Sequence, residues 1–316
     1  MSKIKNNTSS AQKHNNFHFL HKKGPSFEGF YFKTAHADGT TLVIICGFAK
    51  SKDKSHAFIQ VSSQSLKTFY FEYPINALKT NKETFNFSVG NNTFTKQGIK
   101  IQEEDCEIKL SFSEFELWDR SYLNPSIMGV LTFVPFVECK HDIISPFLKV
   151  NGEAKLKSKT LHFQDNSGYI DKNWGISFPK NYFWGHISSF ENPTISVQFA
   201  KARPKWLFWK IPVHIGFLRI NGEMHLFKSW KRGQMTMINV GQEEIHLKNN
   251  KYKIELKFDK GDHLNLRAPL NGKLDSTILE RAGIRTLVTI YKKSKNSKYD
   301  IILSETVNNA TLEICS

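Results

Sequence analysis

Short apolar runs, each followed by turn-forming residues, recur along the chain and constrain its fold more than any other feature. The run at 107–115, EIKLSFSEF, alternates polar and apolar residues, which is the period of a strand buried on one face. Asn221-Gly222 separates two such runs and favours a two-residue β-hairpin. The run at 127–137 also has the pattern of a strand, and only 275–281 has a short helical pattern. The sequence therefore predicts an all-β protein of antiparallel strands.

The strand-like runs fall into two sets, which predicts two β-barrels or sandwiches packed together. The chain has 316 residues, enough for two domains of ordinary size. We expect the first to span 24–148 and the second 149–316, with the change near 140–155. Residues 1–23 are polar and are expected to form a mostly disordered arm. The 26 Phe residues favour strands around an apolar cavity over a helical bundle.

Charge and cysteine content bear on the partners and the compartment. The formal net charge of +15 fits nucleic acid, an anionic membrane surface or an acidic ligand, although a generally basic surface is the simpler explanation. None of the four cysteines lies in a CxxC pair. The N-terminal residues lack the apolar segment of a signal peptide, and no apolar run reaches the ~18 residues of a membrane span. We therefore expect a cytoplasmic protein with reduced thiols and with no metal or cofactor.

The densest group of aromatic residues lies at 168–185, GYIDKNWGISFPKNYFWG. This segment contains six aromatic residues together with Asp171 and Lys172. Its polar and apolar residues do not alternate cleanly, and its irregularly placed glycines and proline indicate bends or bulges. One interpretation is an aromatic corner of a barrel. The other is an aromatic-lined pocket with Asp171 as its polar group.

The same segment, GYIDKNWG followed by SFPKNYFWG, resembles the signature of the tocopherol cyclase family. Three more blocks are similar to the family's motifs and lie in the same order: GPSFEGFYFK at 24–33, PFVECKHDIISP at 135–146 and APLNGKLDSTILE at 268–280. The resemblance therefore covers about residues 24–316. The DKNWG core also resembles that of hydroxyneurosporene synthase, a carotenoid hydratase. These resemblances imply two lipocalin-like β-barrels joined face to face.

The resemblance also implies a reaction. Tocopherol cyclases protonate a prenyl double bond and trap the cation with a phenol oxygen, whereas the hydratase traps a similar cation with water. Both reactions need a proton donor in an apolar, aromatic site. Burial keeps a carboxyl protonated, so that it can donate its proton. The aromatic faces then stabilise the cation by roughly 0.5 to 2 kcal/mol per ring. We therefore expect a cyclase-like isomerase that acts on a hydrophobic prenyl or isoprenoid compound.

Asp171 is the first candidate for the acid, and the alternative for it is a carboxylate bonded to the backbone of a turn. The other catalytic candidates are Glu138, His141 and Glu28, followed by Glu280. Glu138 and His141 would point to opposite faces of one strand, so spacing alone does not pair them. Aromatic side chains are the candidate ligand-binding residues, with ordinary core packing as their alternative: Tyr31, Tyr169, Trp174, Phe178, Tyr182 and Trp184.

Other functions stay open at this point. A lipocalin-like carrier of a lipid or isoprenoid needs the aromatic cavity but not a buried acid. The segment 201–219, KARPKWLFWKIPVHIGFLR, is typical of an outer hairpin of the second barrel, and alternatively of a surface that rests on a membrane through Trp206 and Trp209. No recognised RNA- or DNA-binding pattern supports a nucleic-acid partner. We expect a hydrophobic small molecule as the partner, and peripheral membrane contact as a second expectation.

Overall fold

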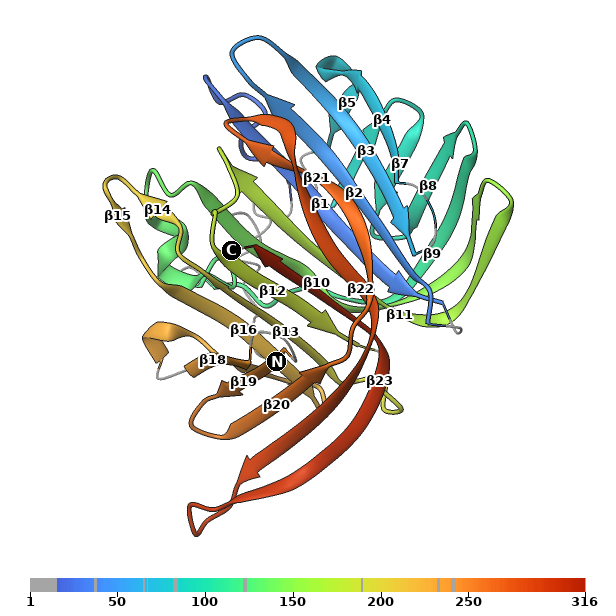
Figure 1. Cartoon of the computed structure of the whole chain (residues 1–316). Helices are drawn as coiled ribbons and strands as arrows, with labels where there is room; N and C mark the ends of the chain where they lie inside the picture. The colour runs from blue at the N-terminus through green and yellow to red at the C-terminus, as the bar shows by residue number, and fades with distance from the viewer. Residues whose placement is uncertain are drawn as a thin grey trace, which may run out of the picture.

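The computed structural model describes residues 16–315 apart from a few short stretches. These are 37–38, 65, 67, 82–84, 122–123, 189, 232–233 and 240–242. The described residues form antiparallel strands and short 3-10 helices, with no α-helix among them (Figure 1), so the prediction of an all-β protein is confirmed. No helix in this part of the chain is long and apolar enough to cross a membrane.

The first sheet contains eleven strands in the order β4–β3–β2–β1–β11–β10–β9–β8–β7–β6–β5. Its two edge strands, β4 and β5, are joined in the chain by the 3-10 helix η2 (Ile75–Ala77), so the sheet curls into a nearly closed barrel (Figure 1). Its strands are β1 (Ser26–Ala35), β2 (Thr41–Lys50), β3 (Ser55–Ser63), β4 (Phe69–Pro74), β5 (Leu78–Thr80), β6 (Asn86–Val89), β7 (Asn92–Thr95), β8 (Gly98–Glu103), β9 (Cys106–Glu116), β10 (Cys139–Leu156) and β11 (Lys159–Gly175).

The second sheet has the order β17–β16–β13–β12–β23–β22–β20–β19–β18, and β21 pairs with β22 beside this path. Its edge strands are again successive in the chain, with η4 (Ser229–Lys231) between them. Its strands are β12 (Tyr182–Ile187), β13 (Ser196–Ala202), β16 (Val213–Ile220), β17 (Glu223–Leu226), β18 (Gln234–Asn239), β19 (Glu244–Lys248), β20 (Tyr252–Phe258), β21 (Asp262–Leu270), β22 (Lys273–Lys293) and β23 (Tyr299–Cys315). A separate hairpin consists of β14 (Lys205–Trp206) and β15 (Trp209–Lys210), and η3 (Gly129–Phe133) precedes β10.

The strands at the centre of the molecule are buried on both faces. In β1, Phe30 and Phe32 point into the core of the first barrel, whereas Tyr31 between them belongs to a separate apolar cluster with Trp184 of the second sheet. This double burial explains why the aromatic segment does not alternate cleanly between polar and apolar residues. In β12, a Cβ added to Gly185 would lie 2.3 Å from the Phe199 ring, so glycine permits close packing there.

The β21–β22 hairpin fastens the two sheets together. The Arg267 backbone N–H donates to Gln60 Oε1 at 2.9 Å, and Thr68 Oγ1 donates to the Asn265 carbonyl at 2.9 Å. Leu264 is buried in the same cluster as Tyr31 and Trp184. The hairpin of the second sheet therefore covers strands of the first (Figure 1).

Two local predictions are wrong. Residues 275–281 lie inside strand β22, because β21 pairs with this stretch and β23 joins the ladder from Glu280 onward, and this pairing overrides the local helical pattern. Residues 127–137 contain η3 rather than a strand, because the side chains of Ser126 and Asp142 accept hydrogen bonds from the turn backbone. The sheets change between Gly175 and Tyr182, and the expected division at 148/149 falls inside β10.

Candidate active site between the two sheets

A partly open cavity of about 160 Å³ lies between the first and second sheets. Both sheets contribute to its wall, which is mainly apolar and aromatic. Six of the eleven residues predicted for the site line this cavity: Tyr31, His141, Asp171, Phe178, Tyr182 and Trp184. The structure therefore brings together residues from four strands and from the loop after β11.

Asp171 is the buried acid of the first wall. Strand β11 places it between Tyr31 of β1 and Ile143 of β10. The Tyr169 hydroxyl donates to Asp171 Oδ2 at 3.0 Å, and Asn173 Nδ2 donates to Oδ1 at 3.3 Å. Burial raises the pKa of Asp171 well above its usual value, since the charged form loses its water, and the hydrogen bond from Tyr169 only partly opposes this. Burial therefore favours the protonated form of Asp171.

A chain of hydrogen bonds behind Asp171 orients the site. Asn173 Oδ1 accepts a hydrogen bond at 3.0 Å from His141 Nδ1, which must therefore carry the ring hydrogen. Burial lowers the pKa of His141, so the imidazole is neutral and its Nε2 faces the side-chain amide nitrogen of Gln198 at 3.4 Å. Because His141 has this tautomer, Asn173 is held with its amide nitrogen towards Asp171.

The second sheet supplies two further buried carboxyl groups. Glu313 lines the cavity and accepts a hydrogen bond from the Tyr182 hydroxyl at 2.8 Å. Glu280 lies opposite Glu313 in the β22–β23 ladder and accepts from the Tyr31 hydroxyl at 3.0 Å. Burial raises the pKa values of both acids, and Glu313 raises that of Glu280 further. The cavity thus has on each wall a buried acid whose pKa is raised, Asp171 on one and Glu313 on the other.

The aromatic rings near Asp171 pack against one another in pairs and leave an N–H donor without a partner among the described residues. Tyr169 lies flat on His186, with ring centroids 3.9 Å apart, and the Tyr31 ring meets Trp184 edge-on at 5.3 Å. Trp184 Nε1 is buried and has no hydrogen-bond partner among the described residues, although Trp184 lines the cavity. This N–H is therefore available to an oxygen of a bound molecule.

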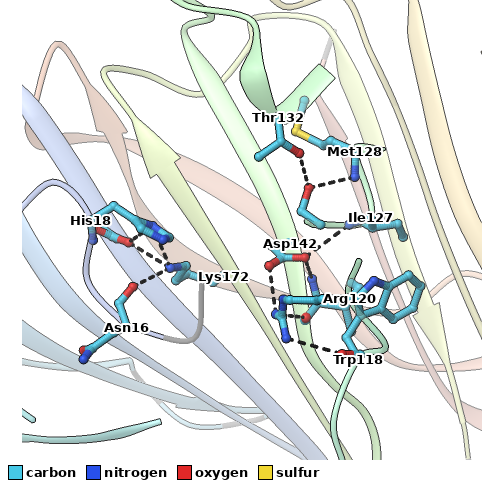
Figure 2. Close-up of polar contacts among 12 residues, drawn as sticks. Asn16, His18, Trp118, Arg120, Ile127, Met128, Thr132, Asp142 and Lys172 are labelled. Carbon is cyan, nitrogen blue, oxygen red and sulfur yellow. Dashed lines mark hydrogen bonds and ion pairs between the residues drawn. The ribbon is translucent and has the colours of Figure 1, made fainter. Parts of the chain in front are cut away.

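The segment before β10 covers the cavity through Met128. Asp142 fixes this segment, as Figure 2 shows: it accepts from Arg120 at 2.9 Å and from the Ile127 backbone N–H at 3.2 Å. Both charged side chains are buried, at 3% and 0% exposure, so each compensates the other in a site that excludes water. The Asp142–Arg120 pair is therefore structural and positions the cover.

Glu28 and Trp174 do not reach the cavity. They lie on the face of β1 and β11 that points into the first barrel, beside Lys172 and His18 (Figure 2 shows the last two). Lys172 Nζ donates to Glu28 Oε1 at 2.9 Å. Burial alone would raise the pKa of Glu28, but the Lys172 charge and the hydrogen bond from His18 hold it below its usual value. Glu28 is thus a paired carboxylate rather than a proton donor.

The remaining predicted residues lie around the cavity. Tyr169 is behind Asp171 and supports it through its hydroxyl. Glu138 lies directly before β10, where its Oε1 accepts from the Lys205 backbone N–H at 2.7 Å, and burial raises its pKa. It does not line the cavity. The described residues contain no group of three or more His, Cys, Asp or Glu that could hold a metal ion.

Sequence reasoning missed Glu313, Asn173 and Gln198 as site residues. Asn173 is two residues after Asp171 in a strand, so its place on the same face was open to prediction. Glu313 offered a weaker signal, an acid among apolar residues in the last strand. Its position opposite Asp171 depends on how the two sheets pack, which local sequence does not specify.

Comparison with known proteins places this fold in a family. The sequence model of a family described as tocopherol cyclase-like matches residues 79–316. The chain belongs to the tocopherol cyclase-like family. A putative AttH protein from Nitrosomonas europaea is similar in structure, with a TM-score of 0.53 and 10% identity, over 95% of this chain and 94% of that chain.

CghA, solved with Sch210972, has a TM-score of 0.55 and 7% identity, over 92% of this chain and 88% of that chain. A second structure of CghA gives a TM-score of 0.53. At these identities the likeness supports the fold alone, which is the expected lipocalin-like arrangement. A search of curated proteins finds no significant match.

Proposed function

We propose that this tocopherol cyclase-like protein is an isomerase that cyclises a hydrophobic prenyl or isoprenoid compound in the cavity between its two sheets, with Asp171 as the acid. The observation that carries the proposal is the buried Asp171 carboxyl, whose pKa is raised by burial, in the wall of a mainly apolar cavity. Family membership supports the same class of reaction.

In the proposed reaction the Asp171 carboxyl gives its proton to one carbon of a prenyl double bond, and a tertiary cation forms at the other carbon. The rings of Tyr31, Tyr182 and Trp184 stabilise that cation by roughly 0.5 to 2 kcal/mol each. A phenol oxygen of the same molecule bonds to the cationic carbon, and its proton returns to the Asp171 carboxylate. The product is an isomer of the substrate, and no co-reactant is consumed.

Asp171→Asn tests this assignment because the amide has no acidic proton but still accepts a hydrogen bond from Tyr169. We expect turnover of a prenylated hydroquinone, followed by liquid chromatography and mass spectrometry, to fall about 10²- to 10⁴-fold. The folded state should persist, because an uncharged group replaces a carboxyl that is already protonated. Asp262→Asn, an exposed acid at the start of β21, is the matched control and should keep full turnover.

Turnover that survives Asp171→Asn in the folded protein would contradict the assignment. The second candidate function, carriage of a lipid or isoprenoid without chemistry, is favoured by the apolar wall of the cavity. It predicts that the wild type and Asp171→Asn retain the same compound, identified by mass spectrometry of an organic extract, and that neither forms product.

A further inference from the structure

Exposed aromatic side chains gather on two neighbouring loops at one edge of the molecule. The turn of the β14–β15 hairpin carries Phe208, which is 96% exposed, and Trp209 follows at 71%. Phe136, on the segment between η3 and β10, is 78% exposed. Figure 1 shows this hairpin projecting beside the segment that contains η3. We call Phe136, Phe208 and Trp209 the aromatic patch. Large apolar side chains exposed together at loop tips mark a contact surface.

The two loops are fastened to each other, so the aromatic patch is presented by ordered backbone. Val137 and Trp206 form an isolated antiparallel bridge. The Glu138 backbone N–H donates to the Lys205 carbonyl at 3.2 Å, and the Lys205 N–H donates to Glu138 Oε1 at 2.7 Å. Binding through this surface would therefore cost little ordering of the chain.

Positive charges lie beside the aromatic patch, where Lys205 and Lys210 pair across the β14–β15 hairpin. Burial raises the pKa of Glu138, and the charges of Lys205, Lys210 and Lys180 are close enough to oppose that rise. All three lysines are exposed. An apolar tip with lysines beside it is complementary to a surface that is apolar inside and negatively charged outside.

The patch adjoins the cavity. Cys139 and Lys140 follow Phe136 along the chain, Pro204 precedes the hairpin, and all three line the cavity. We propose that the aromatic patch docks on a bilayer that contains anionic phospholipid, so that an apolar ligand passes between the acyl chains and the cavity. This docking does not depend on whether the bound molecule reacts.

Co-sedimentation of the full chain with vesicles tests the docking. Vesicles of equal parts phosphatidylcholine and phosphatidylglycerol should bind the wild type, and pure phosphatidylcholine should bind it more weakly because the lysines lose their partners. The double variant Phe208→Ser with Trp209→Ser should lose about tenfold or more in affinity for the anionic vesicles. Ile301→Ser with Ile302→Ser is the matched control, because it removes two exposed apolar side chains on β23. This control should bind like the wild type.

Equal binding of the wild type and the Phe208/Trp209 variant to anionic vesicles would overturn the proposal. Failure of the wild type to bind anionic vesicles would also overturn it. A different outcome is a wild type that is dimeric in analytical ultracentrifugation and a variant that is monomeric, with no vesicle binding by either protein. That outcome would assign the patch to contact with a second copy of the chain. That result would also overturn the proposal. Circular dichroism of both variants verifies that each one is folded.

Discussion

Glu280 is a fully buried carboxyl group. Among the described residues, no positively charged side chain lies within hydrogen-bond distance of it, and its Oε2 has no hydrogen-bond partner. Its Oε1 accepts from the Tyr31 hydroxyl, and burial together with Glu313 raises its pKa. A raised pKa in the folded state contributes stability below the unfolded pKa of ~4.5, and that contribution is lost as the pH rises through the folded value. The acid therefore makes folding pH-dependent.

Glu280→Gln should remove this dependence while keeping an acceptor for Tyr31. Between about pH 4.5 and about pH 6.5 we expect the variant to gain in stability over the wild type by up to about 1.4 kcal/mol per pH unit. This range lies below the pKa of Lys33, which burial lowers to about 7. Urea unfolding at a series of pH values measures the difference. Glu104→Gln, which replaces an exposed acid, is the control and should leave the free energy of unfolding nearly unchanged. A pH-independent difference for Glu280→Gln would refute the expectation.

At the residue scale, the sequence indicated residues of the cavity wall where acidic and aromatic side chains cluster in one segment. Asp171 and Tyr182 lie in one aromatic segment, and both line the cavity. Glu28 illustrates the limit: nothing local to it reveals Lys172, which lies opposite through the β1–β11 ladder and holds the acid ionised. Which face of a doubly buried strand meets the cavity depends on the neighbouring strands, so the sequence ranked Asp171 first but did not show that Glu28 faces away from the cavity.

At the scale of elements, the segment at 16–20 acts as a plug in the first barrel. The Phe17 ring lies 5.1 Å from those of Phe30 and Phe87, measured between centroids. Glu28 Oε2 accepts from the backbone N–H groups of His18 and Phe19, at 2.7 and 2.8 Å. This end of the expected arm is therefore packed against the barrel, while residues 1–15 lie outside the described part of the chain.

Phe17→Ala should destabilise the protein by about 2 kcal/mol, because it removes a partly buried ring from an aromatic cluster. Chemical unfolding with urea, followed by circular dichroism, gives the change. Phe136→Ala removes the same ring from a position that is exposed to solvent, and it should change stability by less than about 0.5 kcal/mol. Equal effects of the two substitutions would show that the plug contributes nothing to the barrel.

Strands and turns could be predicted from the sequence where the local pattern of residues favours the same structure as the pairing within the sheet. The alternation at 107–115 lies within β9, which spans Cys106–Glu116. Asn221 and Gly222 form the turn between β16 and β17, and both have positive φ, 53° and 73°. By contrast, β22 continues through residues 275–281 because the partner strand β21 pairs with this stretch and β23 joins from Glu280 onward. Such pairing comes from distant parts of the chain, which a local pattern does not contain.

At the scale of the whole molecule, the two sheets are expected to be energetically coupled through the cluster between them. Val43 of β2 and Leu264 of β21 belong to this cluster, whereas Ile44 points the other way into the first barrel. A double-mutant cycle of Val43→Ala with Leu264→Ala should give an interaction free energy of about 0.5 kcal/mol or more. Ile44→Ala with Leu264→Ala should be additive. Additivity of both pairs in chemical unfolding would show that the sheets are independent.

The family motifs predicted two barrels packed together, which the structure confirms as a lipocalin-like arrangement. They did not indicate where one sheet gives way to the other. β11 belongs to the first sheet up to Gly175, and β12 opens the second at Tyr182, so the aromatic segment supplies strands to both. A continuous motif therefore spans the junction between the two sheets. For this reason no change in composition marks the position where the first sheet ends and the second begins.

Because the cavity wall comes from both sheets, binding of a molecule in the cavity is thermodynamically linked to the stability of the packed sheets. A molecule bound there contacts the two sheets at once, and it binds the assembled form but not the unfolded chain. At a free concentration of 100 times its Kd, such a molecule would add about 2.7 kcal/mol to the free energy of unfolding. The melting temperature of the purified protein is therefore itself an assay, through which candidate ligands can be ranked before any reaction is known.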